Sequence, residues 1–447
     1  MIEFEKLGIP TAGFATHEFE GDWEHSGRLF GLPNVPYVII PYTMTSRNRD
    51  EARKDAEGAF ETLVKTLTSR PPDDGRIASA RARPAEVEKF KGSDRHEAWE
   101  DFNRAFMDRG WADGFPLIAP TPQLVEQFVK AAKRDPSEVV GHLAPAYGAG
   151  TVEKIAINTA MAGCQPEHLP ILLAAVEAIS QTPESVFPAR SIMMSTSPTA
   201  LLMVINGPIV DKLGIQSGRC ALGPGKPGRV NTVLGRALRL IAMNVGHCYP
   251  GFGDMDTIGS PLKYSMCIAE NEGKNPWEPF HVERGFKKEQ STVTVFGVSD
   301  VIHMANYQRN AELHLTAWAA RASTGGHRDP IIPSRVESDD STELMFLVPD
   351  HARNLAQDGY NKKSIREFIS KNAKIPLKFM VASLPTSLDS LPKNLEWIFQ
   401  MDPDTLMSTV PNPETINIVV VGGPTGKSDW VRCAGAPTIT REIVTGR

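Results

Sequence analysis

Thiols, an imidazole and carboxylates gather in the middle of this 447-residue chain. His247 and Cys248 are adjacent in a loop rich in glycine and proline, and a second thiol, Cys220, precedes an apolar, helix-like run that ends at this loop. A thiolate is a strong nucleophile, and a nearby imidazole can accept its proton. We therefore expect thiol chemistry in which Cys220 or Cys248 is the reactive group and His247 is its base.

A second group of titratable residues follows within "CIAENEGKNPWEPFHVERGF" (267–286). Paired carboxylates beside an imidazole suit general acid–base catalysis. This pattern predicts, as an alternative, a lyase or hydrolase that uses Glu270, Glu272, His281 and Glu283, with Trp277 as an aromatic wall against the substrate. Such an enzyme could act with or without a metal. Cys220, His247, Cys248 and His281 could also hold zinc, although no Cys-x-x-Cys or His-x-x-x-His spacing supports this.

The run "GIQSGRCALGPGKPGRVNTVLGRALRL" (214–240) combines glycines and basic side chains just before a helical pattern. Asn231 is expected to cap this helix at its N-terminus. A helix N-terminus offers free amide N–H groups and a positive dipole end, which favour a bound anion. The sequence therefore predicts a carboxylate or phosphate cradle, with packing alone as the alternative. Its expected residues are Gly223, Gly225, Lys226, Arg229, Asn231 and Arg236.

The stretch "VVVGGPTGKSDW" (419–430) resembles a P-loop but departs from it. The phosphate-binding pattern needs glycine five positions before the Gly-Lys-Ser glycine, and Val421 stands there. We expect a buried strand followed by a tight turn, which leaves open a ligand-facing loop at the carboxyl end of that strand.

Composition excludes several classes of protein. The net charge is −5 and the pI is about 6.2, so a nucleic-acid partner is not expected. No apolar run is long enough to span a membrane, and the N-terminus does not read as a signal peptide. Five cysteines spread over a long chain do not form a disulfide framework. We expect free thiols in a reducing cytoplasm, and no cofactor is required by the sequence, although a catalytic metal is possible.

Strand-like and helix-like patterns alternate along the chain, which predicts an α/β fold of two to three domains with mixed or parallel sheets. The sequence shows no internal repeat. The expected divisions are an N-terminal α/β unit with an incomplete sheet (1–70), a linker or arm (71–96), a central glycine-rich region with the candidate site (97–335) and a C-terminal α/β unit (336–447).

Several motifs resemble those of the UGSC (seleno)protein family. They include "EKLGIPTAGFATHEF", "NVPYVIIPYT", "GWADGFPLIAPT", "TVEKIAINTAMAGCQPEHLPILLAAVEA", "LGPG", "AENE" and "PWEPFHVERGF". The resemblance implies redox chemistry of the glycine-reductase type at a selenocysteine or cysteine, Gly, Ser, Cys motif just before the first of these segments. That motif is absent here, because no cysteine precedes Cys164. We expect that the segment is truncated, supplied by a partner chain, or unused in this branch.

Together these patterns predict an enzyme that acts on a small, anionic substrate by thiol-linked redox chemistry. The alternatives are the lyase or hydrolase above and a non-catalytic subunit whose partner carries the redox motif. An incomplete parallel sheet exposes an edge that another chain or element should cover. The N-terminal unit is therefore expected to form a homo- or hetero-oligomeric contact.

Overall fold

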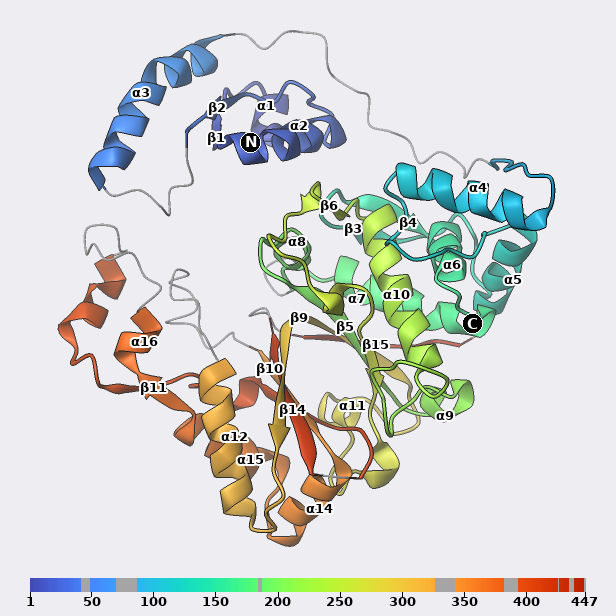
Figure 1. Cartoon of the computed structure of the whole chain (residues 1–447), viewed down its shortest axis with the longest axis vertical. Coiled ribbons are helices and arrows are strands. Elements are labelled where there is room, and N and C mark those ends of the chain that lie inside the picture. Colours follow the sequence, from blue (N-terminus) through green and yellow to red (C-terminus); the bar gives the residue numbers. More distant parts are fainter. Residues whose placement is uncertain are drawn as a thin grey trace.

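The protein is described from a computed structural model that covers residues 1–41, 49–69, 87–183, 187–325, 342–381, 393–424, 426–433 and 438–445. The fold is mixed α/β, as the sequence predicts, with one large sheet and several two-stranded sheets (Figure 1). Most of the predicted linker at 71–96 and the predicted boundary at 335/336 lie outside the described residues.

The N-terminal unit is a small α/β unit in which two parallel strands are joined through a helix. Its elements are α1 (Ile2–Lys6), β1 (Gly13–Ala15), α2 (Glu20–Leu29), β2 (Tyr37–Ile39) and α3 (Arg49–Thr68). The strand-like patterns at 8–16 and 36–43 contain β1 and β2, and the amphipathic helical pattern at 50–67 lies within α3. The described sheet of this unit has two strands.

The large sheet has seven strands in the order β13-β10-β14-β9-β5-β8, with β15 also paired to β9. The strands are β5 (Ala200–Asn206), β8 (Cys267–Ala269), β9 (Thr292–Ala305), β10 (Glu343–Leu347), β13 (Ile416–Val420), β14 (Lys427–Cys433) and β15 (Ile439–Glu442). The first half of β9 pairs with β5 and β15, and its second half pairs with β14. One long strand is therefore shared by the central and the C-terminal parts of the chain.

The two halves of the sheet have the same connectivity. In the first half, β5 pairs in parallel with β8 and antiparallel with β9. In the second half, β10 pairs in parallel with β13 and antiparallel with β14. Each half thus consists of a strand, a helical crossover to a parallel strand, and a third strand that returns antiparallel to the first. The two halves are joined where β9 pairs antiparallel with β14. This repeated topology is not visible in the sequence.

The sheet curls until its two edge strands meet. The backbone N–H of Asn271, just after β8, donates to the carbonyl of Val420 at the end of β13 (2.7 Å). The side chain of Asn271 also reaches the carbonyl of Gly422 (3.4 Å). The carboxyl ends of β8 and β13 therefore lie together, although these strands stand at opposite edges of the sheet.

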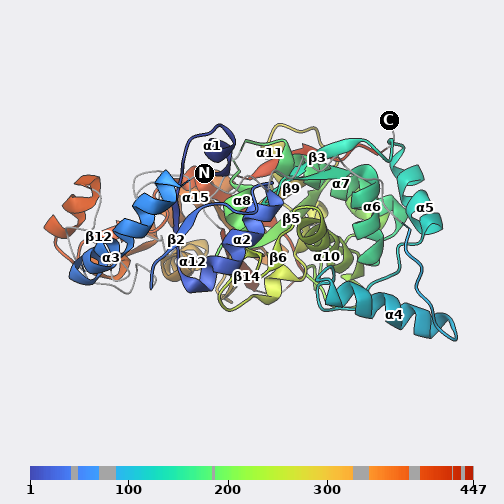
Figure 2. The same ribbon diagram turned by 90° about the horizontal axis from the view of Figure 1, so that it is seen from above.

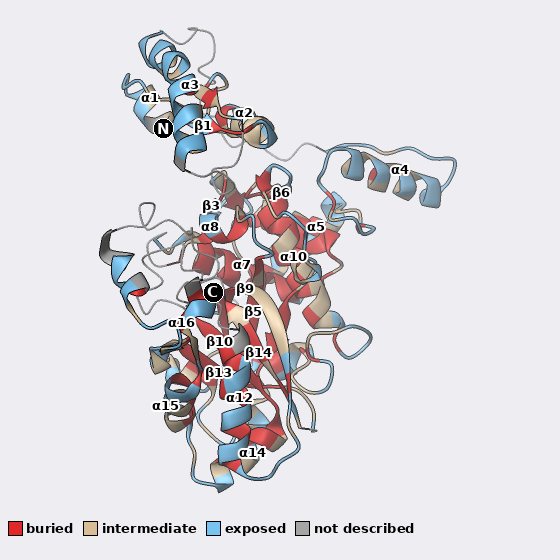
Figure 3. Ribbon diagram, turned by 60° about the vertical axis from the view of Figure 1, so that its left-hand side comes forward, coloured by how far each residue is buried: buried red, intermediate tan, exposed pale blue. Residues whose placement is uncertain are grey.

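Alternate residues of the strands point to an inner and an outer core, as a pleated strand requires. Leu202 and Val204 of β5 face the inside of the curl with Leu344 and Phe346 of β10. The outer face of the first half packs on α5 (Pro122–Ala132), α6 (Val152–Met161), α7 (Leu169–Ser180) and α10 (Arg229–Asn244). The outer face of the second half packs on α12 (Ala311–Gly325), α14 (Pro349–Gln357) and α15 (Lys362–Asn372). Figure 3 shows that buried residues occupy much of the sheet and of helices packed on it, such as α7.

The remaining elements are short or peripheral, and α4 lies at the margin of the molecule (Figure 2). They are α4 (Arg95–Asp108), β3 (Val139–Leu143), β4 (Gly148–Thr151), α8 (Ala189–Met193), α9 (Ile209–Leu213), β6 (Tyr249–Pro250), β7 (Gly253–Asp254), α11 (Phe280–Glu283), β11 (Lys374–Pro376), α16 (Leu377–Val381) and β12 (Leu406–Ser408). Among the described residues, every helix is too short or too polar to cross a bilayer.

Local residue types explain several features of these elements. Thr121 caps α5 by accepting a hydrogen bond from the backbone N–H of Leu124 (3.3 Å). All residues of β13 are buried, as its apolar run predicts, and the described residues after it lead into the antiparallel strand β14 rather than a P-loop helix. The expected cap of α10 is wrong, because the N-cap residue is Gly228 and the helix begins at Arg229.

Helix α10 crosses the start of β8 at very short range. A Cβ atom on Gly235 would lie 2.5 Å from the backbone N of Met266 and 2.5 Å from Oγ of Ser265. Only glycine lets the helix backbone approach the strand this closely. This contact fixes where α10 begins and ends relative to β5 and β8.

We therefore expect Gly235→Ala to lower the free energy of unfolding by roughly 1–3 kcal/mol, the usual cost of overpacking, despite the better helix propensity of alanine. Gly273→Ala is the control, because a Cβ there meets nothing within 4 Å, and its effect should stay within about 0.5 kcal/mol. Denaturant unfolding of the full chain measures both. Equal midpoints for the two variants would contradict the close approach.

Candidate functional site

The segment Gln216–Gly228, which we name the Cys220 loop, lies where the carboxyl ends of β8 and β13 meet. The backbone N–H of Gly422 donates to the carbonyl of Ser217 (2.8 Å), so the loop is bonded to the end of β13. Ala221 is buried in the inner core of the curled sheet. Carboxyl ends of parallel strands are the usual place for ligands in α/β folds.

The glycines of this loop have a packing reason. A Cβ on Gly228 would lie 2.7 Å from Cα of Gly223 and 3.0 Å from the carbonyl oxygen of Cys220. The backbone N–H of Gly223 donates to that same oxygen (2.8 Å). The loop thus folds back on Gly228, the N-cap of α10. Asn231 does not cap the helix, because its amide pairs with both backbone groups of Gln216 (2.8 and 2.9 Å).

Cys220 is held in a left-handed backbone conformation, with φ of 58°. Such angles are uncommon for residues other than glycine and often occur at functional sites. Its side chain is exposed, and its carbonyl lies beside Gly228, the N-cap of the 16-residue helix α10. The loop therefore leaves this thiol accessible to solvent.

Three basic residues lie in this loop or directly after it, and all three are exposed: Arg219, Lys226 and Arg229. The stem of Arg219 lies against Gly423, since a Cβ there would be 2.1 Å from Cγ of Arg219. Lys226 and Arg229 are exposed, and within the described ranges neither forms a salt bridge. Gly223 and Gly225 both have positive φ (89° and 92°). The loop can therefore present cations and a thiol to solvent.

The other four thiols are buried and free. Burial raises the pKa of Cys248 to about 11 and raises the pKa of Cys164, Cys267 and Cys433 well above the ordinary thiol value. The Sγ of Cys248 donates to the carbonyl of Met193 (3.1 Å). These cysteines behave as small core residues, so the geometry favours Cys220 over Cys248 as the reactive thiol.

His247 is not placed to serve either thiol. Cys220 precedes α10 and His247 follows it, and a 16-residue helix is about 24 Å long. The ring of His247 lies against Tyr249, with 5.8 Å between ring centroids, and in the part of the chain that the structure describes it has no hydrogen bond to Cys248. Burial lowers the pKa of His247, so the imidazole is neutral near pH 7. The expected thiol–imidazole pair is not formed.

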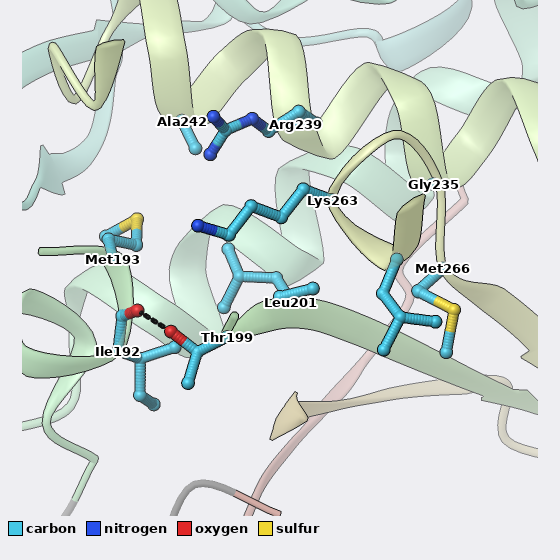
Figure 4. Close-up of a pocket in the computed structure, with 11 residues that line it drawn as sticks. Ile192, Met193, Thr199, Leu201, Gly235, Arg239, Ala242, Lys263 and Met266 are labelled. Atoms are coloured by element: carbon cyan, nitrogen blue, oxygen red, sulfur yellow. Dashed lines mark hydrogen bonds between the residues drawn. The ribbon is translucent and has the colours of Figure 1, made fainter. Parts of the chain in front are cut away.

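Cys248 instead borders a closed network of charges. Arg239 and Lys263 both pair with Asp254 (2.8 and 2.7 Å), and Lys263 also pairs with Asp256 (2.7 Å). Arg239 and Lys263 extend across a small cavity above Leu201 (Figure 4), whose volume of about 20 Å³ has room for roughly one water molecule. The charges balance within the network, so it stabilises the loop and leaves no space for a substrate.

Glu270 lies at the carboxyl end of β8 and is almost fully buried. Its carboxylate accepts hydrogen bonds from the side chains of Asn206 (2.5 Å) and Asn275 (2.9 Å) and from the backbone N–H of Phe280 (2.7 Å). Burial raises its pKa to about 7, and nearby Lys362 acts in the opposite direction. Glu270 therefore ties three segments together and has little access to a substrate.

Glu272 and His281 lie next to Glu270. One oxygen of Glu272 accepts from the backbone N–H of Gly207 (2.7 Å) and lies 3.5 Å from Nδ1 of His281. His281 is fully buried, and neither ring nitrogen forms a hydrogen bond in the described structure. The structure thus brings Glu270, Glu272 and His281 together, but in a closed arrangement.

Glu283 and Trp277 join the two halves of the molecule. Glu283 pairs with Lys362 (2.7 Å) and Arg366 (3.1 Å) of α15. Lys362 is buried and also donates to the carbonyl of Glu278 (2.8 Å). The indole N–H of Trp277 donates to the carbonyl of Tyr360 (3.0 Å). Both predicted site residues therefore make contacts that hold α15 against the segment after β8.

Arg236 is not part of an anion cradle. Its guanidinium makes a bidentate pair with Asp113 (2.7 and 2.8 Å) and also donates to the carbonyls of Phe115 and Pro116 (3.2 and 3.1 Å). Asp113 is 3% exposed in this pair. The planar fork of arginine suits such a contact, which anchors the segment after α4 to α10.

The N-terminal unit rests on the loop that contains Cys248. Gly253 donates its backbone N–H to Asp22 (3.0 Å), and His25 lies against Phe252 with 5.1 Å between ring centroids. Residues 1–69 match the family model of the UGSC family. They form a UGSC domain. The rest of the chain is unassigned, and no curated protein or solved structure matches it significantly.

The UGSC domain thus covers only the first part of the sequence resemblance. The central motifs, among them "GWADGFPLIAPT" and "PWEPFHVERGF", have a structural explanation in the chain itself, because they supply Asp113, Trp277 and Glu283 to the contacts above. Among the described residues, no group of three or more His, Cys, Asp or Glu side chains is placed to share a metal ion.

Several residues that shape these sites were missed by the sequence reasoning. Asn206 and Asn275 donate to Glu270, and Lys362 lies buried beside Glu283. Asn206 ends an apolar strand and precedes Gly207, which is a usable signal for a strand-end residue. Nothing in the sequence marks Lys362 as buried, because the pattern around it is that of an amphipathic helix with an exposed face.

Arg236→Ala should lower stability rather than anion affinity. Removing one partner of a nearly buried ion pair leaves Asp113 unpaired, which costs about 3–5 kcal/mol. Arg229→Ala is the matched control, because Arg229 is exposed and its loss should change stability by less than about 0.5 kcal/mol. Thermal and denaturant unfolding test this, and a normal stability of Arg236→Ala would refute the anchoring role.

Proposed function

We propose that the chain is an enzyme that acts on a small, anionic substrate through the thiol of Cys220. The observation that carries this proposal is the contrast among the five cysteines: Cys220 is exposed, whereas the other four are buried. Its left-handed backbone and its place beside the N-cap of α10 add support. Arg219, Lys226 and Arg229 supply positive charge for a carboxylate or phosphate.

The chemistry that suits this arrangement is thiol–disulfide exchange. The Cys220 thiolate would attack a sulfur of an oxidised substrate, form a mixed disulfide and release the other sulfur as a thiolate. A second thiol must then attack the mixed disulfide, which returns Cys220 to its reduced form. The remaining four cysteines are buried, so this second thiol is expected from a partner or a small-molecule thiol.

The acid–base alternative has weaker support. Glu270 and His281 are closed off, and Glu283 is engaged by two cations. Glu272 and Glu283 keep partial exposure, with 21% and 20% of their side chains accessible, but Glu283 is paired with those two cations. The alternative of a non-catalytic subunit is compatible with the UGSC domain. Under this alternative Cys220 has no catalytic role. Free cysteines throughout are consistent with a reducing, cytoplasmic location.

Brief treatment with iodoacetamide, followed by mass spectrometry, tests the proposal. Cys220 should be alkylated at least tenfold faster than Cys164, Cys248, Cys267 and Cys433 in the folded protein. The difference is expected because Cys220 is exposed, whereas the other four thiols are buried.

Cys220→Ser provides the control for site assignment, since it should remove the fast phase and leave the slow labelling unchanged. Fast labelling that persists in Cys220→Ser would mean that another cysteine is the accessible one and would overturn the thiol mechanism. Slow labelling of all five cysteines would do the same.

We also propose that the UGSC domain forms an oligomeric contact. This domain exposes large apolar side chains: Phe4 (53%), Leu7 (74%), Ile9 (49%), Phe14 (52%) and Phe60 (62%). Apolar surface of this kind on one small unit is typical of an interface. The proposed contact is consistent with a partner that carries the redox motif or with a second copy of the chain.

Sedimentation equilibrium of the purified chain should show a mass above that of the monomer. Phe14→Glu and Phe60→Glu should shift the equilibrium toward monomer, because each places a charge in the proposed interface. Ile258→Glu is the control, since Ile258 is 95% exposed outside the UGSC domain and should not matter. A wild-type monomer at about 50 μM, well above the Kd of a stable complex, would contradict the contact.

A further inference from the structure

A polar groove lies on the second half of the molecule, apart from the Cys220 loop. It runs between one face of α14 and the segment Asn306–Arg309 that follows β9, and its volume is about 560 Å³. This size lies in the range of small-molecule sites. The groove stands next to the carboxyl end of β10, the place in the second half where α/β folds hold ligands.

The floor of the groove is a fixed chain of buried hydrogen bonds. His351 is 2% exposed, and its Nε2 lies 2.9 Å from the carbonyl of Asn306 while its Nδ1 lies 2.8 Å from Oγ of Ser428. A carbonyl only accepts, so Nε2 carries the proton and Nδ1 accepts from the serine hydroxyl. The same hydroxyl oxygen accepts from the backbone N–H of Val348 (3.1 Å).

This chain of bonds makes the groove rigid. Burial lowers the pKa of His351 to about 4, so the imidazole stays neutral and keeps both bonds at neutral pH. A Cβ on Gly426 would lie 2.2 Å from the carbonyl oxygen of Asn306 and 3.1 Å from Nε2 of His351, so glycine is needed at the floor. A preorganised wall of this kind is what a binding site requires.

The walls are rich in side-chain amides. Gln308 stands on one wall, and Asn354 and Gln357 stand on α14. Within the described residues, none of these three amide side chains has a hydrogen bond to protein. Each amide can both donate and accept, which matches the needs of a hydroxyl group. The groove therefore suits a ligand with several hydroxyls.

Among its described residues, the groove also contains one cationic side chain that is free to bind a ligand, that of Arg309. Arg353 is engaged by Asp350 (2.7 Å), whereas Arg309 forms no salt bridge in the described ranges. Its guanidinium can take a carboxylate or phosphate through two hydrogen bonds. Tyr307 is 75% exposed at the rim and offers an aromatic face.

We propose that this groove binds a small polyhydroxylated oxyanion, a sugar acid or sugar phosphate. The amides of Gln308, Asn354 and Gln357 bind the hydroxyls, and Arg309 binds the acidic group. The proposal does not depend on Cys220, because the groove residues and the Cys220 loop are separate sets.

Isothermal titration of the full chain with glucose 6-phosphate, gluconate, glucose and inorganic phosphate tests the proposal. One or both of the first two should bind with a Kd below about 1 mM. Arg309→Ala should weaken that binding at least tenfold, and Asn354→Leu should weaken it without loss of the helix, because leucine is a good helix former. Arg95→Ala, another exposed arginine, should leave it unchanged.

The two acidic probes distinguish a phosphate from a carboxylate as the group held by Arg309. Binding of inorganic phosphate as tight as that of glucose 6-phosphate would overturn the role of the amides. Binding of glucose as tight as that of the acids would overturn the role of Arg309. Absence of binding by both acids, with an unchanged thermal melt and unchanged Cys220 labelling, would overturn the site itself and leave the proposal for Cys220 standing.

Discussion

The pairing of β9 is the constraint on which the rest of the structure depends. Its first half is bonded to β5 and β15 and its second half to β14, so one strand of 14 residues carries both halves of the sheet. Strands twist with a fixed hand, and the twist accumulates across neighbours. Over the six strands from β13 to β8 it brings the two edge strands together, where Asn271 bonds to Val420. The Cys220 loop is placed by this closure, because it is bonded to the end of β13 and buries Ala221 inside the curl.

The local sequence pattern was enough to predict many helices and strands. It could not predict which of these elements contact one another. The apolar run of β13 reads directly as a strand buried on both faces, and Thr121 reads as a helix cap. By contrast, the bond between Asn271 and Val420 joins residues far apart in the chain, and no local signal specifies it. The same reason explains the wrong cap of α10. Asn231 suits that role by type, but Gln216 offers its amide two backbone partners, and tertiary contact prevails over local preference.

The candidate site was predictable by residue type and less so by geometry. Cys220 was singled out with its glycine-rich loop, and the structure leaves that thiol exposed. The pairing with His247 failed because the length of α10 separates the two residues, a distance that residue types do not reveal. Glu270 and Glu272 lie close together, yet Asn206, Asn275 and Phe280 turn Glu270 inward. Proximity in sequence therefore indicated that these two carboxylates lie close together. It did not indicate whether they are exposed to solvent.

The two halves share a connectivity but use their strand ends differently. After β8 the chain carries Asn271 and Glu272, whose polar groups are taken up by bonds to Gly422 and Gly207. After β13 it carries Gly422 and Gly423, and the missing side chain at Gly423 is what lets the stem of Arg219 lie against it. The end of β8 thus supplies fixed hydrogen bonds, whereas the end of β13 leaves space beside Gly423. A charged residue of the Cys220 loop enters that space, so the loop can remain anchored to the sheet while its thiol faces water. Anchorage without burial is the condition a reactive thiol needs, since burial would raise its pKa as it does for Cys248.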